Sequence, residues 1–279
     1  MTKHILLFIF NLIFFNVFGQ IGVYNLEYQK RHSEELNKIE LEKKQYYYKK
    51  ILSIKNHDSL LLENFKKVDL GSLFVTENYC WDGIIGEDYK RLRIWFHNAI
   101  KSENDSLLYS ITGKTKVNTN ICEFSGTFRL IKAVRDTIVY EDGPPYLVSG
   151  FIYGTFELNE NKSQIGSGVF KGDFFIKWTV NNDTTEIILG DIDYVYRESA
   201  LTFSGTWESY KTAFSKRICW SNYIPYCLPK GFNCSDGPAI IPCKEFAKNG
   251  WETLNEVYDF SNETKRKEAA RIENEEWWK

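Results

Sequence analysis

The residues with the clearest chemistry in this sequence are its six cysteines: Cys80, Cys122, Cys219, Cys227, Cys234 and Cys243. None of them forms the tight Cys-x-x-Cys pair that zinc sites usually contain, so their spacing predicts no metal site. An even number of cysteines in an exported chain favours disulfides instead. We therefore expect all the cysteines to form disulfides, whose connectivity the sequence leaves open.

Carboxylates are the second group that could carry chemistry. Asp191 and Asp193 are two residues apart and share one face of a strand, and Asp173 lies in another predicted strand. Two carboxyl groups about 5 to 10 Å apart across a cleft can hydrolyse glycosidic bonds, and such a pair could equally bind calcium. An exposed turn edge beside Gly190 explains the pair more simply. These residues keep open one alternative function, a secreted hydrolase that acts on glycan or envelope material.

The sequence lacks the other common catalytic signatures. It contains no Gly-x-Ser-x-Gly elbow, no His-Glu-x-x-His helix and no glycine-rich phosphate loop. His32, His57 and His97 lie far apart and form no His-x-x-x-His pair. We therefore predict no catalytic residues, no metal and no cofactor, and we favour a non-enzymatic protein.

One predicted strand, at residues 91–100, carries basic and aromatic side chains on one face. Arg93, Trp95 and His97 share this face because they alternate with apolar residues. Such a face could stack on sugars or bases, which makes the three residues candidates for surface binding. A formal charge of -2 argues against nucleic acid, so a glycan or an envelope protein is the expected partner. The simpler alternative is that the N-terminal helix covers this face.

The elements that must position these groups are β-strands. The pattern apolar-x-Gly-x-aromatic recurs at residues 124–128, 152–156, 170–174 and 203–207. Each copy places a glycine between two large apolar groups on one strand face, and a glycine inside a strand marks a bend or a close approach.

Seven runs with the two-residue period of strands are joined by short polar turns, and they are 91–100, 107–117, 121–135, 146–157, 166–179, 186–196 and 200–210. Short sequential connections favour an up-and-down meander. We expect a mainly β protein, in which about seven to eight antiparallel strands form a barrel-like sheet.

The inward positions of this barrel are aromatic. If the barrel binds a small molecule, that ligand should be apolar and should lie among Phe124, Phe128, Phe156, Phe174, Trp178 and Trp207. Small barrels usually fill their interior with side chains. A filled core is therefore the expectation that we favour.

The N-terminus predicts export. Residues 1–19 begin with Lys3 and His4, continue with an apolar run and end in small residues around Gly19. This is the pattern of a secretory signal peptide, cleaved near Gly19. No later run reaches the roughly 18 apolar residues of a membrane-spanning helix. We expect a secreted or periplasmic protein that is not an integral membrane protein.

The remaining chain divides into three predicted parts. Residues 20–68 are an N-terminal helical segment, rich in Lys, Glu, Tyr and Leu, and residues 24–68 contain neither Gly nor Pro. Residues 69–210 form the barrel-like domain, beginning with a loop that extends to residue 88. Residues 211–279 are an irregular, disulfide-tied segment followed by C-terminal helices, which together form a cysteine-bearing helical cap.

Five stretches carry a resemblance to known proteins, and they are Gly113-Lys-Thr-Lys-Val117, Asn120-Ile-Cys-Glu-Phe-Ser-Gly-Thr127, Gly205-Thr-Trp-Glu-Ser-Tyr-Lys211, Asn249-Gly-Trp251 and the ending Arg271–Lys279. They resemble a group of uncharacterised exported proteins of Bacteroidota, and this resemblance implies no activity or site. Gly205-Thr-Trp207 is also similar to the Gly-x-Trp motif of lipocalin- and avidin-type barrels. There the motif opens the barrel, whereas here it lies near the end of the predicted sheet, so no residue roles are carried over.

These observations lead to one expectation of function. The protein should be an exported, non-enzymatic binding or envelope-interaction protein. Its expected partner is an apolar small molecule, an envelope protein or a glycan, and not nucleic acid.

Overall fold

The computed structural model describes residues 59–136, 149–180, 187–189, 200–212, 214–223, 225, 227–229, 231–235 and 240–279. All of these residues belong to one compact unit, Lys50–Lys279. The predicted signal peptide, most of the predicted N-terminal helical segment, and Asp191 and Asp193 lie outside the described residues. Within the described part of the chain, no helix is long and apolar enough to cross a membrane.

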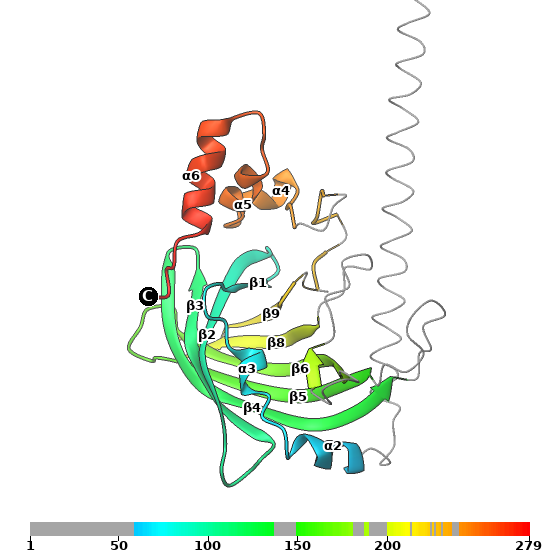
Figure 1. Ribbon diagram of the computed structural model, residues 1–279. Helices are drawn as coiled ribbons and strands as arrows, with labels where there is room; N and C mark the ends of the chain where they lie inside the picture. Colours follow the sequence, from blue (N-terminus) through cyan, green and yellow to red (C-terminus); the bar gives the residue numbers. More distant parts are fainter. Residues whose placement is uncertain are drawn as a thin grey trace, which may run out of the picture. The chain divides into compact units, whose positions relative to one another are not determined.

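The strands form one antiparallel sheet that closes on itself (Figure 1). The described strands are β1 (Trp81–Ile85), β2 (Lys90–Lys101), β3 (Leu108–Val117), β4 (Asn120–Asp136), β5 (Ser149–Glu160), β6 (Gly168–Val180), β7 (Ile187–Leu189), β8 (Leu201–Ser209) and β9 (Ser215–Ser221). Each barrel strand pairs with the next one along the chain, and β9 returns to β1. The short β7 is the described part of the strand predicted at 186–196, and its described residues pair with the end of β6, outside the ring, so this strand is not the barrel strand that was expected. The result is the predicted meander, as a closed barrel of eight strands.

Two strands that close the barrel, β1 and β9, correct the predicted boundaries. Residues up to 88 were expected to form a loop, and the sheet was expected to end at residue 210. Instead β1 and β9 pair with each other, with Gly83 opposite Trp220 and Ile85 opposite Ile218. Most of β1 and the second half of β9 are buried on both faces, so these strands lack the polar alternation that marks the other strands.

Aromatic side chains fill the interior of the barrel. Phe203 is fully buried, and its ring lies 4.8 Å from that of Trp220, 5.2 Å from Phe128 and 5.4 Å from Phe174 (centroid to centroid). The six predicted inward residues all belong to this core and are 0 to 8% exposed; they are Phe124, Phe128, Phe156, Phe174, Trp178 and Trp207. The prediction that these residues face inward is therefore confirmed, and they pack on one another.

Two short helices precede the barrel, α2 (Ser59–Phe65) and α3 (Gly71–Phe74). Phe74 is fully buried, and its ring lies 4.9 Å from that of Phe128 inside the barrel. The Lys101 ammonium, at the end of β2, donates to the carbonyls of Lys66 and Val68 at 2.7 and 2.5 Å. This segment therefore lies where β2 ends, and it adds an apolar side chain to the core.

The C-terminal segment covers the outer face of the closing strands. The outward side chains of Ile84 and Cys219 are buried in a second, smaller core with Phe232 and Trp251. The helices of this segment are α4 (Lys244–Ala247), α5 (Glu252–Val257) and α6 (Glu263–Glu273) (Figure 1). The segment thus packs on the side of the barrel, and its cysteines lie before the helices rather than within them.

A glycine separates the short helices α4 and α5. Gly250 has φ +91° between α4 and α5, a backbone conformation that favours glycine. A Cβ atom there would also lie 3.1 Å from the Asn118 side chain. The last helix is capped by Asn262, whose side chain accepts from the Lys265 amide at 3.1 Å.

Candidate functional site

A buried carboxylate lies at one end of the barrel, beneath the loops β3–β4, β5–β6 and β8–β9. Glu160, the last residue of β5, is 5% exposed. The Thr115 hydroxyl donates to Glu160 Oε1 at 2.5 Å, and the Gly168 amide and Trp207 Nε1–H donate to Oε2 at 2.8 and 3.0 Å. The side chain of Glu160 therefore joins β3, β6 and β8 to β5.

The electrostatics of this end favour a structural role. Burial raises the pKa of Glu160, and hydrogen bonds from Thr115, Trp207 and Gly168 offset only part of the rise. Burial and the nearby Glu160 carboxylate raise the pKa of the Cys122 thiol to about 11. A thiol with this pKa is protonated at neutral pH, so Cys122 is a poor nucleophile.

The sequence around Glu160 carries a weak signal of its position. Phe156, Leu158 and Glu160 continue one inward face at the two-residue period of β5. A charged residue at the end of such a face predicts either a buried polar contact or a solvent-exposed strand end. The register with β3, β6 and β8 decides between the two, and it is a property of the folded barrel.

Three apolar side chains are exposed at the same end, two on loops and one at the start of β4. We call Ile121, Ile165 and Phe214 the apolar rim; they are 36, 79 and 70% exposed. Ile121 follows the β3–β4 turn, Ile165 lies in the β5–β6 loop and Phe214 in the β8–β9 loop. Sequence analysis did not identify these residues, because single apolar residues in turns resemble ordinary surface variation.

Hydrogen bonds place the β5–β6 loop between the other two loops. The Ile165 carbonyl lies 3.8 Å from Cys122 Sγ on β4. On the other side, the Tyr210 amide donates to the Ser167 carbonyl at 3.3 Å. The three side chains of the apolar rim therefore belong to adjoining loops.

A second polar cluster fixes the C-terminal segment to the barrel. The Arg91 guanidinium, on the outer face of β2, contacts both carboxylate oxygens of Asp82 at 2.7 and 2.9 Å. It also contacts both carboxylate oxygens of Glu273, the last residue of α6, at 2.7 and 2.8 Å. The Thr253 hydroxyl donates to Glu273, and Arg91 lies 5.1 Å over the Trp251 ring.

This cluster is a buried ion-pair network. Burial alone would raise the pKa of Glu273, but the hydrogen bond and charge of Arg91 outweigh burial and lower it. For Arg91, burial lowers the pKa, and Asp82 and Glu273 outweigh that effect and raise it. Since Asp82 is on β1 and Glu273 on α6, the network joins the barrel to its C-terminal segment.

The predicted surface-binding face is mostly covered by the end of the chain. Arg93 donates to the Glu273 carbonyl at 3.1 Å and lies 6.0 Å over the Trp277 ring. Trp95 stacks on Trp278 with ring centroids 6.0 Å apart. The third predicted residue, His97, is exposed beside Trp95. The C-terminal residues Trp277 and Trp278 therefore cover Arg93 and Trp95.

The cysteines form two disulfides, and the expectation that all six would pair is corrected. Cys219 pairs with Cys227, and Cys234 pairs with Cys243. The thiols of Cys80 and Cys122 are free. Cys80 precedes β1, where its sulfur accepts from Arg93 Nε at 3.2 Å, whereas Cys122 faces the interior from β4.

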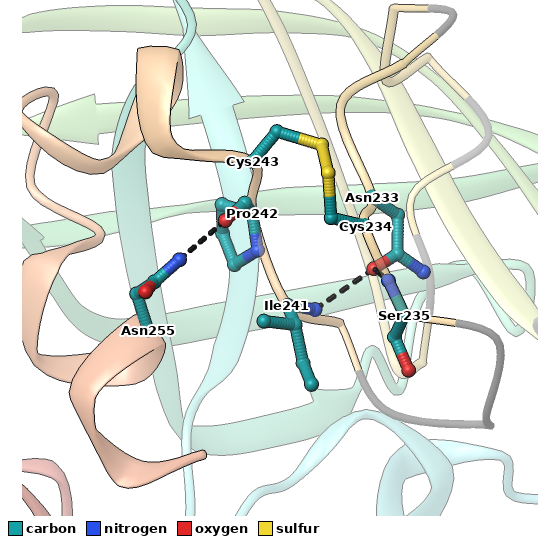
Figure 2. Close-up of a disulfide and its surroundings, with 7 residues drawn as sticks. All are labelled: Asn233, Cys234, Ser235, Ile241, Pro242, Cys243 and Asn255. Atoms are coloured by element: carbon teal, nitrogen blue, oxygen red, sulfur yellow. Dashed lines mark hydrogen bonds between the residues drawn. A yellow bond between two sulfur atoms is a disulfide. The ribbon is translucent and has the colours of Figure 1, made fainter. Parts of the chain in front are cut away.

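Figure 2 shows the disulfide between Cys234 and Cys243 with its surroundings. The Asn233 side chain accepts from the Ile241 amide at 2.9 Å, and the Asn255 side chain, on α5, donates to the Pro242 carbonyl at 2.5 Å. The disulfide and these side-chain bonds hold an irregular segment against α5. The two disulfides are consistent with an extracellular or periplasmic location.

The carboxylates of the hydrolase alternative are only partly described. Asp173 accepts a hydrogen bond from the Tyr153 hydroxyl at 2.7 Å on the outer face of β5 and β6. Asp191 and Asp193 lie outside the described residues, so the hydrolase remains an untested alternative. Among the described residues, no group of three or more His, Cys, Asp or Glu side chains is arranged to hold a metal ion.

No family model, no curated protein and no solved structure matches the chain. The resemblance to exported proteins of Bacteroidota and the similarity to lipocalin- and avidin-type barrels therefore stay predictions, based on the sequence stretches given above.

Proposed function

We propose that this protein is an exported, non-enzymatic binding protein that contacts the cell envelope through its outer surface. In this proposal the barrel is a rigid support and not a carrier of a small molecule. The partner is bound by side chains on loops and outer strand faces.

The packing of the interior is the observation that carries this proposal. An apolar ligand among the inward aromatic residues would have to displace side chains that already contact one another. Phe156 is an example, since its ring lies 5.1 Å from that of Trp220 and 5.6 Å from that of Phe203. Protein interiors are packed as densely as organic crystals, so such a displacement is costly.

The two clusters of charge also support a role in binding rather than catalysis. Both carboxylate oxygens of Glu160 accept hydrogen bonds from protein donors, and Arg91 and Glu273 neutralise each other. A general acid or base needs to reach a substrate proton, whereas these groups are engaged in holding strands and helices together.

Two measurements on the mature protein test the proposal. The first is native mass spectrometry, in which we expect the bare mass of the chain. The second is sedimentation of the purified protein with envelope fragments of the producing organism, in which we expect the protein in the pellet. A small-molecule adduct that is lost on denaturation, or protein that stays in the supernatant, would contradict the proposal.

A further inference from the structure

The β5–β6 loop combines an exposed apolar side chain with a hydrogen-bonded backbone. The Gln164 side chain accepts from the Glu123 amide at 2.8 Å, and the Ser167 hydroxyl donates to the Gln164 carbonyl at 2.9 Å. The Gly168 amide is held by Glu160. Ile165 is fixed between these contacts with its side chain 79% exposed. The loop therefore presents this side chain to the outside rather than folding it inward.

The loops of the apolar rim carry positive charge. Residues 118–121, 161–167 and 210–216 contain three lysines, Lys162, Lys211 and Lys216, and neither Asp nor Glu. Lys162 lies 5.1 Å over the ring of Tyr210, so it belongs to the same surface as the β8–β9 loop.

The carboxylates on the flanking strands do not cancel this positive charge. Glu123 pairs with Lys114 at 3.4 Å, and Glu157 pairs with Lys171 at 3.3 Å. Glu208 is the exposed carboxylate that precedes the β8–β9 loop. The β1–β2 turn lies at the same end, and there Glu87 pairs with Arg217 at 3.1 Å and Asp88 pairs with Lys90 at 3.2 Å. The three loops with their lysines thus remain cationic overall, beside three apolar side chains.

We propose that the apolar rim docks on an anionic phospholipid surface. Ile121, Ile165 and Phe214 enter the interface between headgroups and acyl chains, and the lysines face the lipid phosphates. Apolar side chains flanked by Lys are the combination that binds such surfaces, because buried apolar area and attraction to anionic lipid add together. This inference rests on the proposed function and names the partner and the face that binds it.

A protein partner fits this surface less well. A stable protein interface usually buries about 800 Å² on each side, with a central cluster of anchor residues. The apolar rim offers three separate side chains, two on loops and one at the start of β4. A lipid surface needs no matching pocket, and it can accept each side chain separately.

The test uses co-sedimentation of the mature protein with two kinds of vesicle. One contains phosphatidylcholine alone, and the other equal parts of phosphatidylcholine and phosphatidylglycerol. We expect binding to the anionic vesicles that weakens with added salt. The double variant Ile165→Ser/Phe214→Ser should bind about tenfold more weakly or worse, and Lys162→Glu/Lys211→Glu should lose the preference for anionic lipid.

Phe260→Ser is the matched control, because Phe260 is 80% exposed and lies between α5 and α6, outside the three loops of the apolar rim. It should bind vesicles as well as the original protein does. Circular dichroism must show the same fold for every variant, which is expected since each replaced side chain is exposed or lies on a loop.

Three outcomes would overturn the inference. The first is no binding to anionic vesicles, and the second is binding that Ile165→Ser/Phe214→Ser leaves unchanged. The third is a dimer, seen by light scattering, that this double variant abolishes, since the apolar rim would then contact a second copy. If envelope fragments still bind the protein while pure vesicles do not, the proposed function stands and the lipid assignment fails.

Discussion

At the scale of single residues, Glu160 shows how a buried charge can organise one end of a barrel. Its oxygens accept from Thr115, Gly168 and Trp207, which come from three other strands. A buried polar group without such partners would cost roughly 1–3 kcal/mol. Glu160 therefore satisfies these three donors, and their hydrogen bonds in turn stabilise its buried carboxylate.

The first prediction concerns the pH dependence of stability. The folded state raises the pKa of Glu160 above its ordinary value of 4.5, so it binds the proton more tightly than the unfolded state does. The contribution of Glu160 to the free energy of unfolding must then fall as pH rises from about 4.5 through the folded pKa. In Glu160→Gln, the amide oxygen can accept from Gly168 and Trp207, and the amide group can donate to the Thr115 hydroxyl.

Urea unfolding at a series of pH values measures this effect. The free energy of unfolding of Glu160→Gln, relative to the original protein, should increase with pH across that window. Glu160→Ala is the control, because it leaves the Gly168 and Trp207 donors unpaired and should lose stability at every pH. An equal pH slope for the original protein and Glu160→Gln would refute the role given to this carboxylate.

At the scale of elements, the ion-pair network of Arg91 decides where α6 lies. Replacing Arg91 with Met leaves the carboxylates of Asp82 and Glu273 without their cation, although their side chains are only 22 and 12% exposed. Breaking a buried pair in this way costs about 3–5 kcal/mol. We expect Arg91→Met to lose this much stability in urea unfolding and to make residues 244–279 sensitive to limited proteolysis.

Arg271→Met is a matched control for this variant. Arg271 also pairs with a glutamate, Glu268, but the two side chains are 67 and 57% exposed, and such surface pairs contribute at most about 1 kcal/mol. Equal proteolysis of both variants would contradict this account of α6.

The pKa of Glu273 is lowered in the folded protein. The contribution of this carboxylate to the free energy of unfolding is therefore present above pH 4.5 and is lost as pH falls through the lowered pKa.

The elements also show where sequence patterns were sufficient. Residues 107–117 and 121–135 alternate between apolar and polar side chains, and they form β3 and β4 with nearly these bounds. One face of each strand lies against the core and the other against solvent, so the two-residue period is visible. Residues 81–85 and 215–221 lack this period, because the C-terminal segment also buries the outward side chains of Ile84 and Cys219.

At the scale of the whole molecule, closure of the barrel depends on strands that touch at a glycine pair. Gly172 on β6 lies opposite Gly205 on β8. A Cβ atom on Gly205 would lie 2.0 Å from the Lys171 carbonyl oxygen and 2.7 Å from the Gly172 Cα. Even one methyl group must therefore push these two strands apart.

The prediction at this scale is that Gly205→Ala weakens the closed barrel. Overpacking of this kind costs about 1–3 kcal/mol, and more where the backbone cannot move. Hydrogen exchange should show faster exchange of amides in β6, β8 and β9, because the barrel opens between β6 and β8. Ser204→Ala, at the neighbouring position of β8, should stay within about 0.5 kcal/mol of the original protein. Unchanged exchange in Gly205→Ala would show that the seam tolerates a side chain.

The sequence by itself determined the mainly β class, six of the eight barrel strands and the aromatic residues that face inward. These properties depend on the alternation of side chains along one strand, which is local. Only the tertiary structure decided the rest: that β1 and β9 close the ring, that four cysteines pair while Cys80 and Cys122 stay free, and that Trp277 and Trp278 cover the face of Arg93 and Trp95. Each of these is a contact between distant parts of the chain, set by register and packing that no local pattern records.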